Sequence, residues 1–157
     1  MEPINNFTLG ELPFGYPFRD SQRRLLRNDG QFVAIVNGDD LVLQMEWQDF
    51  SLIATSYDYF DACNHWIYLI RAGCLVDQLS MPDQIGFLQH VESSLDNRLE
   101  IGYYGTHDRW TLSIHESGFF SFKLADLRLR LNRFFLARRF ISIQHTRGPD
   151  WQSPASS

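Results

Sequence analysis

The sequence has few cysteines, almost no lysine and no long hydrophobic run. Cys63 and Cys74 are the only cysteines in 157 residues, too few for a secreted disulfide scaffold and without the CxxC pairs of a zinc site. We interpret both as free thiols that pack as small buried hydrophobic side chains. No apolar stretch approaches the length of about 18 residues that a membrane-spanning helix needs.

The first residues also lack the pattern of a targeting segment. Glu2, Pro3 and Asn5 stand where a signal peptide would carry cations followed by an apolar block. Together with the missing hydrophobic run, this predicts a cytoplasmic protein that has no membrane partner.

The common motifs of enzyme chemistry are missing as well. The chain contains no glycine-rich phosphate loop, no HExxH metal motif and no GxSxG nucleophile elbow. We therefore expect a protein that is not an enzyme and that binds no cofactor and no metal ion.

What is present is the composition of a folded domain. Hydrophobic residues make up 44% and charged residues 21% of the chain, which excludes wholesale disorder. Aromatic residues at 15% supply a large core. We expect one domain over 1–146 and a flexible tail over 147–157, where serine and proline are concentrated.

Alternating apolar and polar residues predict eight short strands. The clearest hairpin signal is Asn37-Gly38 between two apolar runs, because Asn-Gly favours the positive φ angles of a tight turn. In the strand after this turn, alternation predicts one face on a core and one face toward water or a partner. The strands are expected at 32–36, 41–45, 50–56, 66–70, 74–79, 99–103, 110–114 and 120–124.

Other segments carry different signals. Apolar residues recur at helical spacing over 82–95 and again over 125–140, which predicts two covering helices. A short helix is expected over 21–27, after Asp20 as its cap. Apolar residues at every second or third position of 7–18 predict an extended segment that crosses a core. The predicted fold class is α+β, with antiparallel sheet(s) of short hairpin-connected strands and two covering helices.

Charge is distributed unevenly along the chain. Residues 28–126 hold four cations and fifteen acids, net −11, whereas residues 127–157 hold six arginines and one acid, net +5. Acidic residues interleaved with aromatic ones suit the capture of a basic protein, because charge speeds association and aromatic rings slow dissociation. A solvated face that only keeps the protein soluble is the alternative. The candidate partner-binding residues are Asp39, Asp40, Glu46, Trp47, Asp49, Tyr57, Asp58, Tyr59 and Asp61.

The arginine-rich segment near the C-terminus supports a second hypothesis. Its side chains could bind the phosphates of a nucleic acid, or they could pair with the acidic body of the same chain. The sequence pI of about 5.4 favours internal pairing, because nucleic-acid-binding domains are usually basic. The residues concerned are Arg128, Arg130, Arg133, Arg138 and Arg139.

Two small constellations keep a third hypothesis, an enzyme, in view. Asp58, Asp61 and His65 would share one face if their segment were helical, and could then hold a divalent metal ion. The sequence His107-Asp108-Arg109 lies in a predicted turn and could handle a phosphate group. In both cases we favour a polar turn without chemistry.

In size, acidity and lack of catalytic motifs, the chain resembles the immunity proteins that neutralise bacterial toxins. The resemblance is one of composition and charge and involves no shared motif. It implies a cognate basic toxin or effector as the partner, occluded through the acidic surface. A homodimer is left open.

Overall fold

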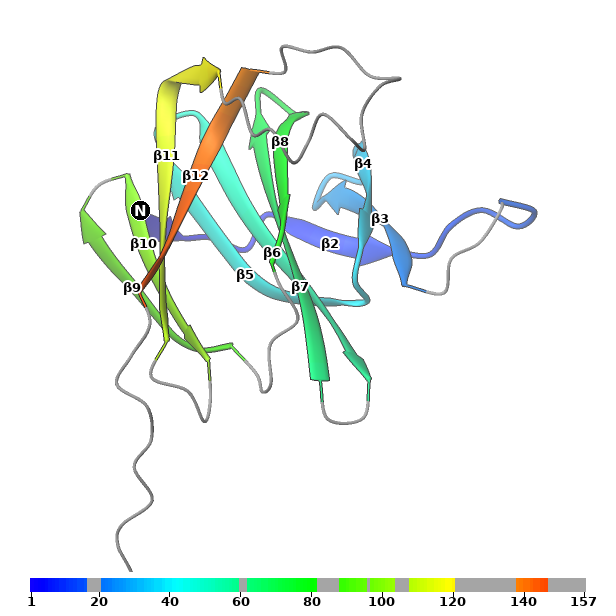
Figure 1. Cartoon of the computed structure of the whole chain (residues 1–157). Coiled ribbons are helices and arrows are strands. Elements are labelled where there is room, and N and C mark those ends of the chain that lie inside the picture. Colours follow the sequence, from blue (N-terminus) through cyan, green and yellow to red (C-terminus); the bar gives the residue numbers. More distant parts are fainter. Residues whose placement is uncertain are drawn as a thin grey trace, which may run out of the picture.

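The described residues of the computed structural model form twelve strands in three antiparallel sheets (Figure 1). These residues are 1–16, 21–59, 62–81, 88–95, 97–103, 108–120 and 138–146. The strands are β1 (Glu2–Pro3), β2 (Phe7–Gly10), β3 (Gln22–Arg27), β4 (Phe32–Asn37), β5 (Asp40–Trp47), β6 (Phe50–Tyr59), β7 (Ala62–Arg71), β8 (Cys74–Ser80), β9 (Leu88–Leu95), β10 (Arg98–Tyr103), β11 (Arg109–Phe120) and β12 (Arg138–Thr146).

A central sheet of five strands lies between the other two sheets. Its strand order is β1-β5-β6-β7-β8. One of its faces packs against the four-stranded sheet, β12-β11-β10-β9, and the other against the three-stranded sheet, β2-β3-β4. The molecule therefore has two hydrophobic cores, one on each side of the central sheet.

The sequence of β6 and β7 explains this arrangement. Both strands contain continuous apolar runs rather than alternating ones, as expected for strands buried on both faces. Leu52 and Ile67 enter the core shared with the four-stranded sheet, whereas Ile53 and Tyr68 enter the other core. All four side chains are at most 2% exposed.

The predicted helix over 82–95 is wrong, and with it the α+β fold class. Residues 88–95 form β9, which pairs with β10, and residues 82–87 lie outside the described residues. Apolar spacing over so short a segment suits a strand as well as a helix. His90, Val91 and the two serines Ser93 and Ser94 are mediocre helix formers, and pairing with the buried β10 decides the outcome.

The second covering helix is also contradicted where it can be tested. Residues 138–140 begin β12, whose Ile141 and Ile143 face the larger core, while residues 125–137 are outside the described part. The short helix expected over 21–27 is likewise wrong, because Gln22–Arg27 is strand β3 and buries Leu25 completely. All secondary structure in the described part is strand and turn.

The predicted hairpins between 32 and 79 are confirmed. The strands expected between 32 and 79 are all present, with the turn at Asn37-Gly38 and a second one at Ala72-Gly73. The turn expected at 116–118 is instead a bulge inside β11, which ends at Phe120 rather than starting a new strand there. Residues 121–124 and the predicted tail 147–157 lie outside the described residues.

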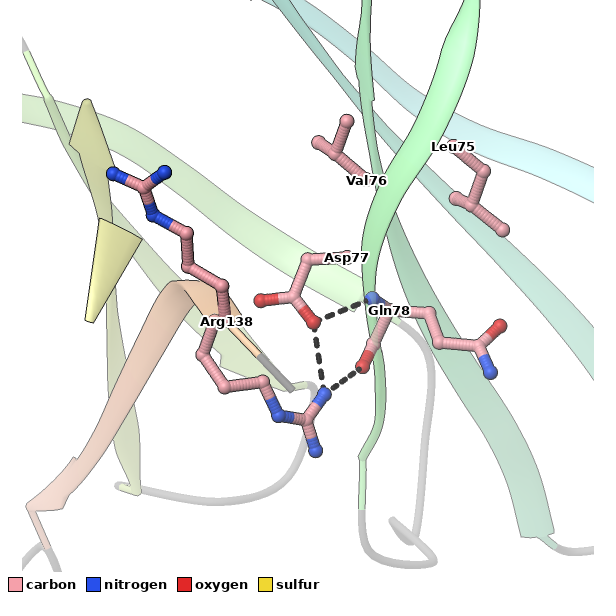
Figure 2. A pocket seen from close by; sticks show the side chains of 6 residues that line it. Leu75, Val76, Asp77, Gln78 and Arg138 are labelled. Atoms are coloured by element: carbon pink, nitrogen blue, oxygen red, sulfur yellow. Dashed lines mark hydrogen bonds and ion pairs between the residues drawn. The ribbon is translucent and has the colours of Figure 1, made fainter. Parts of the chain in front are cut away.

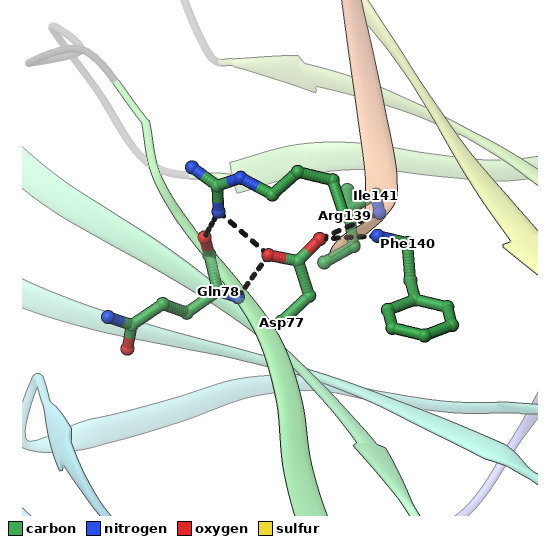
Figure 3. A network of polar contacts seen from close by, with 5 residues as sticks. All are labelled: Asp77, Gln78, Arg139, Phe140 and Ile141. Atoms are coloured by element: carbon green, nitrogen blue, oxygen red, sulfur yellow. Dashed lines mark hydrogen bonds and ion pairs between the residues drawn. The ribbon is translucent and has the colours of Figure 1, made fainter. Parts of the chain in front are cut away.

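A buried carboxylate links the edge of the central sheet to the edge of the four-stranded sheet (Figure 3). Asp77 on β8 accepts backbone N–H bonds from Phe140 (2.7 Å) and Ile141 (2.9 Å) through one oxygen. Its other oxygen accepts from the Gln78 backbone N–H and the Arg139 guanidinium, both at 2.8 Å. With the Asp77 side chain only 4% exposed, these bonds hold β8 beside β12.

A side-chain amide links the central sheet to the start of the three-stranded sheet. Gln44 on β5 accepts the backbone N–H groups of Asn6 and Phe7, both at 3.0 Å, and donates to the Phe7 carbonyl at 3.1 Å. It thereby substitutes for a neighbouring strand at the start of β2. The face of β5 expected to meet water or a partner is engaged here by the chain itself.

Candidate functional site

The acidic and aromatic residues singled out in the sequence lie at two opposite ends of the β5–β6 hairpin. Asp40 pairs with Ser56 at one end, and Trp47 pairs with Phe50 at the other. Glu46 lies six positions after Asp40, which corresponds to about 20 Å along a strand. The predicted surface is therefore divided in two. We call Asp39, Asp40 and Asp58 the acidic end, and Glu46, Trp47 and Asp49 the far end.

Backbone hydrogen bonds hold the turn that carries Asp39 and Asp40, whereas the Asp58 carboxylate contacts the buried Cys63 thiol. Gly38, with a φ of 99°, donates to the Ser21 carbonyl at 2.6 Å. Asp39 donates to the Ser56 carbonyl at 2.9 Å, which places the turn against β6 two residues before Asp58. All three carboxylates of the acidic end are exposed.

The acidic end is also free of ion pairs with arginines of the described chain. Three carboxylates elsewhere have such partners: Arg27–Asp29, Arg71–Asp49 and Arg139–Asp77. Because none of these belongs to the acidic end, its negative charge faces solvent without a cation of the described residues beside it. Uncompensated charge of this kind attracts cationic partners over a Debye length.

The far end is built differently. The Arg71 guanidinium bonds the Asp49 carboxylate at 2.6 Å and lies over the Phe50 ring at 4.6 Å from its centroid. Trp47 stacks on the same ring, with 5.9 Å between centroids. Asp49 and Trp47 thus serve to close the hairpin, and of the far end only Glu46 remains as a carboxylate without an arginine in the described chain.

The remaining residues of the predicted surface are Tyr57, Tyr59 and Asp61. Tyr57 is half-buried on β6 and interacts within the chain. Tyr59 is the last residue of β6, and Asp61 is outside the described residues.

A cysteine and a histidine meet in the larger core near Asp58. Cys63 Sγ lies 3.5 Å from His65 Nε2, and the His65 ring packs edge-on against Tyr103 with 5.0 Å between centroids. Burial, together with the neighbouring Asp58 carboxylate, raises the pKa of Cys63 to about 12. Burial lowers the pKa of His65, although Asp58 acts in the opposite direction. A neutral thiol beside a neutral imidazole is not an activated nucleophile.

The metal hypothesis finds no support in this arrangement. Asp58 is exposed and His65 is only 3% exposed, on two neighbouring strands rather than on one helix. Within the described part of the chain, no group of three or more His, Cys, Asp or Glu side chains could hold a metal ion. Both cysteines are free thiols, as expected, but Cys74 is exposed rather than buried.

The predicted phosphate-handling turn is occupied by other contacts. Asp108 Oδ2 lies 3.1 Å from His145 Nε2, and His145 stacks on Trp110 with 4.2 Å between centroids. The Arg109 guanidinium donates to the Asp108 carbonyl at 3.1 Å, and His107 is outside the described residues. His145 could not be assigned to this group from the sequence, because its register opposite Trp110 depends on strand β12, which was not predicted.

A shallow hollow of about 220 Å³ lies between β8 and β12 (Figure 2). The guanidinium of Arg139 is bound to Asp77 and to the Gln78 carbonyl. Arg138 points away from Asp77 in the figure and donates to the Ser117 carbonyl. Both arginines are therefore engaged within the chain, and the hollow presents no free cation to a ligand. The lining residues are Leu75, Val76, Asp77, Gln78, Arg138 and Arg139.

These contacts also bear on the arginine-rich segment. Arg138 and Arg139 belong to β12 and bind groups of the chain itself, whereas Arg128, Arg130 and Arg133 lie outside the described residues. Arg139 therefore pairs with a carboxylate of the acidic body, Asp77, whereas Arg138 bonds a backbone carbonyl.

Comparison with known protein families, with curated proteins and with solved structures finds no match for this chain. Over the described residues, no helix is both long and apolar enough to cross a membrane.

Proposed function

We propose that the chain is a non-catalytic protein-binding module that captures a cationic partner protein through its acidic end. The observation that carries this proposal is the exposure of Asp39, Asp40 and Asp58 without an arginine partner in the described chain. Such a group steers a basic protein toward itself and accelerates association, particularly at low salt.

The partner class follows from the resemblance in size and charge to immunity proteins. A cationic toxin or effector domain is a partner of the required sign, and a protein without catalytic groups neutralises it by occluding its active site. The product of a gene next to the one that encodes this chain is the first partner to test, after co-purification from the native host.

The test is association kinetics with the purified partner. Charge reversal by Asp39→Lys with Asp40→Lys is expected to lower the association rate constant at least tenfold at low salt and to weaken its salt dependence. Asp29→Lys is the matched control, because Asp29 is equally exposed but already lies beside Arg27. Equal association rates for wild type and the double variant would refute the proposal.

A further inference from the structure

Residues 11–16, directly after β2, extend away from the sheets (Figure 1), and we call them the arm. Two aromatic residues, Phe14 and Tyr16, form what we call its tip. Phe14 is 106% exposed and Tyr16 is 41% exposed, the former being as accessible as in an extended peptide. The sequence predicted that both would cross a core, but among the described residues of this segment, 7–16, only Phe7 and Leu12 are buried. An aromatic side chain left fully in water loses the free energy of burial that Phe14 would gain in a core.

The tip is ordered by local contacts. Tyr16 N–H donates to the Pro13 carbonyl at 3.2 Å, and Gly15 has a φ of 87°. A four-residue turn with glycine at its third position and positive φ there is a type II turn. Phe14 therefore stands at the second position of a closed turn, where its side chain points outward.

The base of the arm is anchored as well. Leu12 is 8% exposed, and the Arg24 guanidinium on β3 donates to the Glu11 carbonyl at 2.7 Å. A side chain presented on an anchored turn loses little conformational entropy when it binds, which is the condition for a strong contact residue.

The arm leaves the three-stranded sheet at the end where the acidic end lies. Gly10, at the base of the arm, pairs with Arg24, and Gln22 of the same strand β3 pairs with Asn37, directly before Gly38. Ser21, the first described residue after the arm, accepts a hydrogen bond from Gly38 N–H at 2.6 Å. Asp39 and Asp40 follow Gly38 directly. The arm and the two carboxylates therefore extend from the same end of the three-stranded sheet, which we call the corner, although 23 positions separate Tyr16 from Asp39 in the sequence.

We infer that this arm is a plug, which inserts Phe14 and Tyr16 into an apolar pocket of the partner protein while Asp39 and Asp40 contact cationic side chains at the pocket's rim. This inference rests on the proposed function and names the feature that the partner must have. Aromatic residues dominate the energetics of protein interfaces when they fill a desolvated pocket, and surrounding charges mainly affect the association rate.

The charge at this corner favours a protein over the other apolar surfaces that could receive the tip. An anionic lipid surface would repel Asp39 and Asp40. A second copy of the chain would bring the same carboxylates against each other if it bound symmetrically through this corner. A cationic protein is attracted by the same groups.

The first experiment places the photocrosslinker p-benzoyl-L-phenylalanine at position 14 in cells that encode the chain. Position 32 is the matched control, because Phe32 is 53% exposed at the end of the three-stranded sheet opposite the arm. A protein crosslinked from position 14 and not from position 32 is expected, and it is then purified. No product from position 14, or the same product from both positions, overturns the inference.

The second experiment measures binding kinetics with that purified protein. The double variant Phe14→Ser with Tyr16→Ser is expected to raise the dissociation rate constant about 100-fold while leaving the association rate within about twofold. Phe32→Ser is expected to leave both rates unchanged. Because the two tip residues are exposed, urea unfolding of the double variant should match wild type and show that the fold is intact.

The outcomes separate the two proposals. If the tip variant binds like wild type while Asp39→Lys with Asp40→Lys associates more slowly, the plug is refuted and the proposed function stands. If only the tip variant is impaired, the acidic end is refuted as the capture site. Tip-dependent sedimentation with vesicles of phosphatidylcholine and phosphatidylglycerol, or a dimer that Phe14→Ser dissociates, would each overturn the assignment to a partner protein.

Discussion

Replacing Asp77 should be the most destabilising single polar substitution in the described part of the chain. Its carboxylate accepts hydrogen bonds from four N–H groups. Two of these are the backbone N–H groups of Phe140 and Ile141, which link β12 to β8. In Asp77→Ala these two backbone donors lose their partner at a buried site. Each such loss costs about 1–3 kcal/mol.

The arginine contributes less to this cost. The Arg139 side chain is 28% exposed and can recover water when its carboxylate is removed. We therefore expect Asp77→Ala to lower the free energy of unfolding by about 4 kcal/mol, within the range for breaking a buried pair. For a chain of this size that corresponds to a fall in Tm of roughly 10 °C.

Two further variants rank the hydrogen bonds of Asp77 by their contribution to the free energy of unfolding. Asp77→Asn retains one acceptor oxygen and turns an NH2 group toward two donors, so it should lose about 2–3 kcal/mol. Arg139→Ala leaves three of the four N–H donors in place and should lose about 1 kcal/mol. Asp29→Ala is the control, because its side chain is 61% exposed and its pair with Arg27 spans 4.0 Å, and it should change stability by less than about 0.5 kcal/mol.

The assay is equilibrium unfolding in urea, followed by tryptophan fluorescence. A free energy for Asp77→Ala within about 0.5 kcal/mol of wild type would show that the edges of the two sheets are held by apolar packing alone. The same result would remove the link between β8 and β12 from the account of the fold.

Three more substitutions test other parts of the structure by the same assay. Gln44→Met keeps the shape of the side chain but removes the three hydrogen bonds to the start of β2, and should cost about 2–3 kcal/mol; no loss would mean that β2 is held by its core residues. Gly38→Ala should lower the free energy of unfolding by about 3 kcal/mol, because its φ is 99° and the new Cβ would lie 2.8 Å from the Ser56 carbonyl oxygen. Gly73→Ala is the control: its φ is 77° and no atom lies near the new Cβ, so it should lose about 1 kcal/mol. The pKa of His65 in the folded state is below its unfolded value near 6.5, because burial disfavours the charged imidazole. As pH falls, the unfolded chain therefore binds this proton before the folded chain does. The free energy of unfolding should decrease below about pH 6.5, by up to about 1.4 kcal/mol per pH unit. His65→Gln should remove that part of the slope and the exposed His115→Gln should not; equal slopes would refute the assignment to His65.

The part of the fold that sequence reasoning predicted correctly rests on local signals. The hairpins between 32 and 79 have turn residues with positive φ between apolar runs, and both signals lie within a few neighbouring residues. The errors at 82–95 and 138–140 have the opposite origin. Their apolar spacing is compatible with both helix and strand, and the deciding factor is a strand partner elsewhere in the chain, β10 for one and β11 for the other.

The candidate surface could be predicted only in part, because the sequence does not show which strand residues lie opposite each other. The sequence shows that Asp39, Glu46 and Asp58 are close in the chain, but it does not show that β5 carries Glu46 to the opposite end while β6 brings Asp58 back. Nor does it show which carboxylates receive an arginine, since the partner of Asp49 is 22 residues away on β7. The exposure of Phe14 was not predicted, because its apolar spacing with Phe7 and Leu12 outweighed the turn formers Pro13 and Gly15 on either side of it.

The burial of the central sheet on both faces has a consequence for where this chain can bind. Residues in the middle of β6 and β7 are enclosed by two cores, so their side chains are not available to a partner. Central-sheet residues reach solvent mainly where strands end, as at Asp39, Asp40 and Asp58. A rigid body whose functional residues lie on the turns at one end binds through that end, as sandwich folds commonly do. If the proposed function is correct, the partner should therefore meet the corner that the acidic end shares with the arm, and not a face of the central sheet.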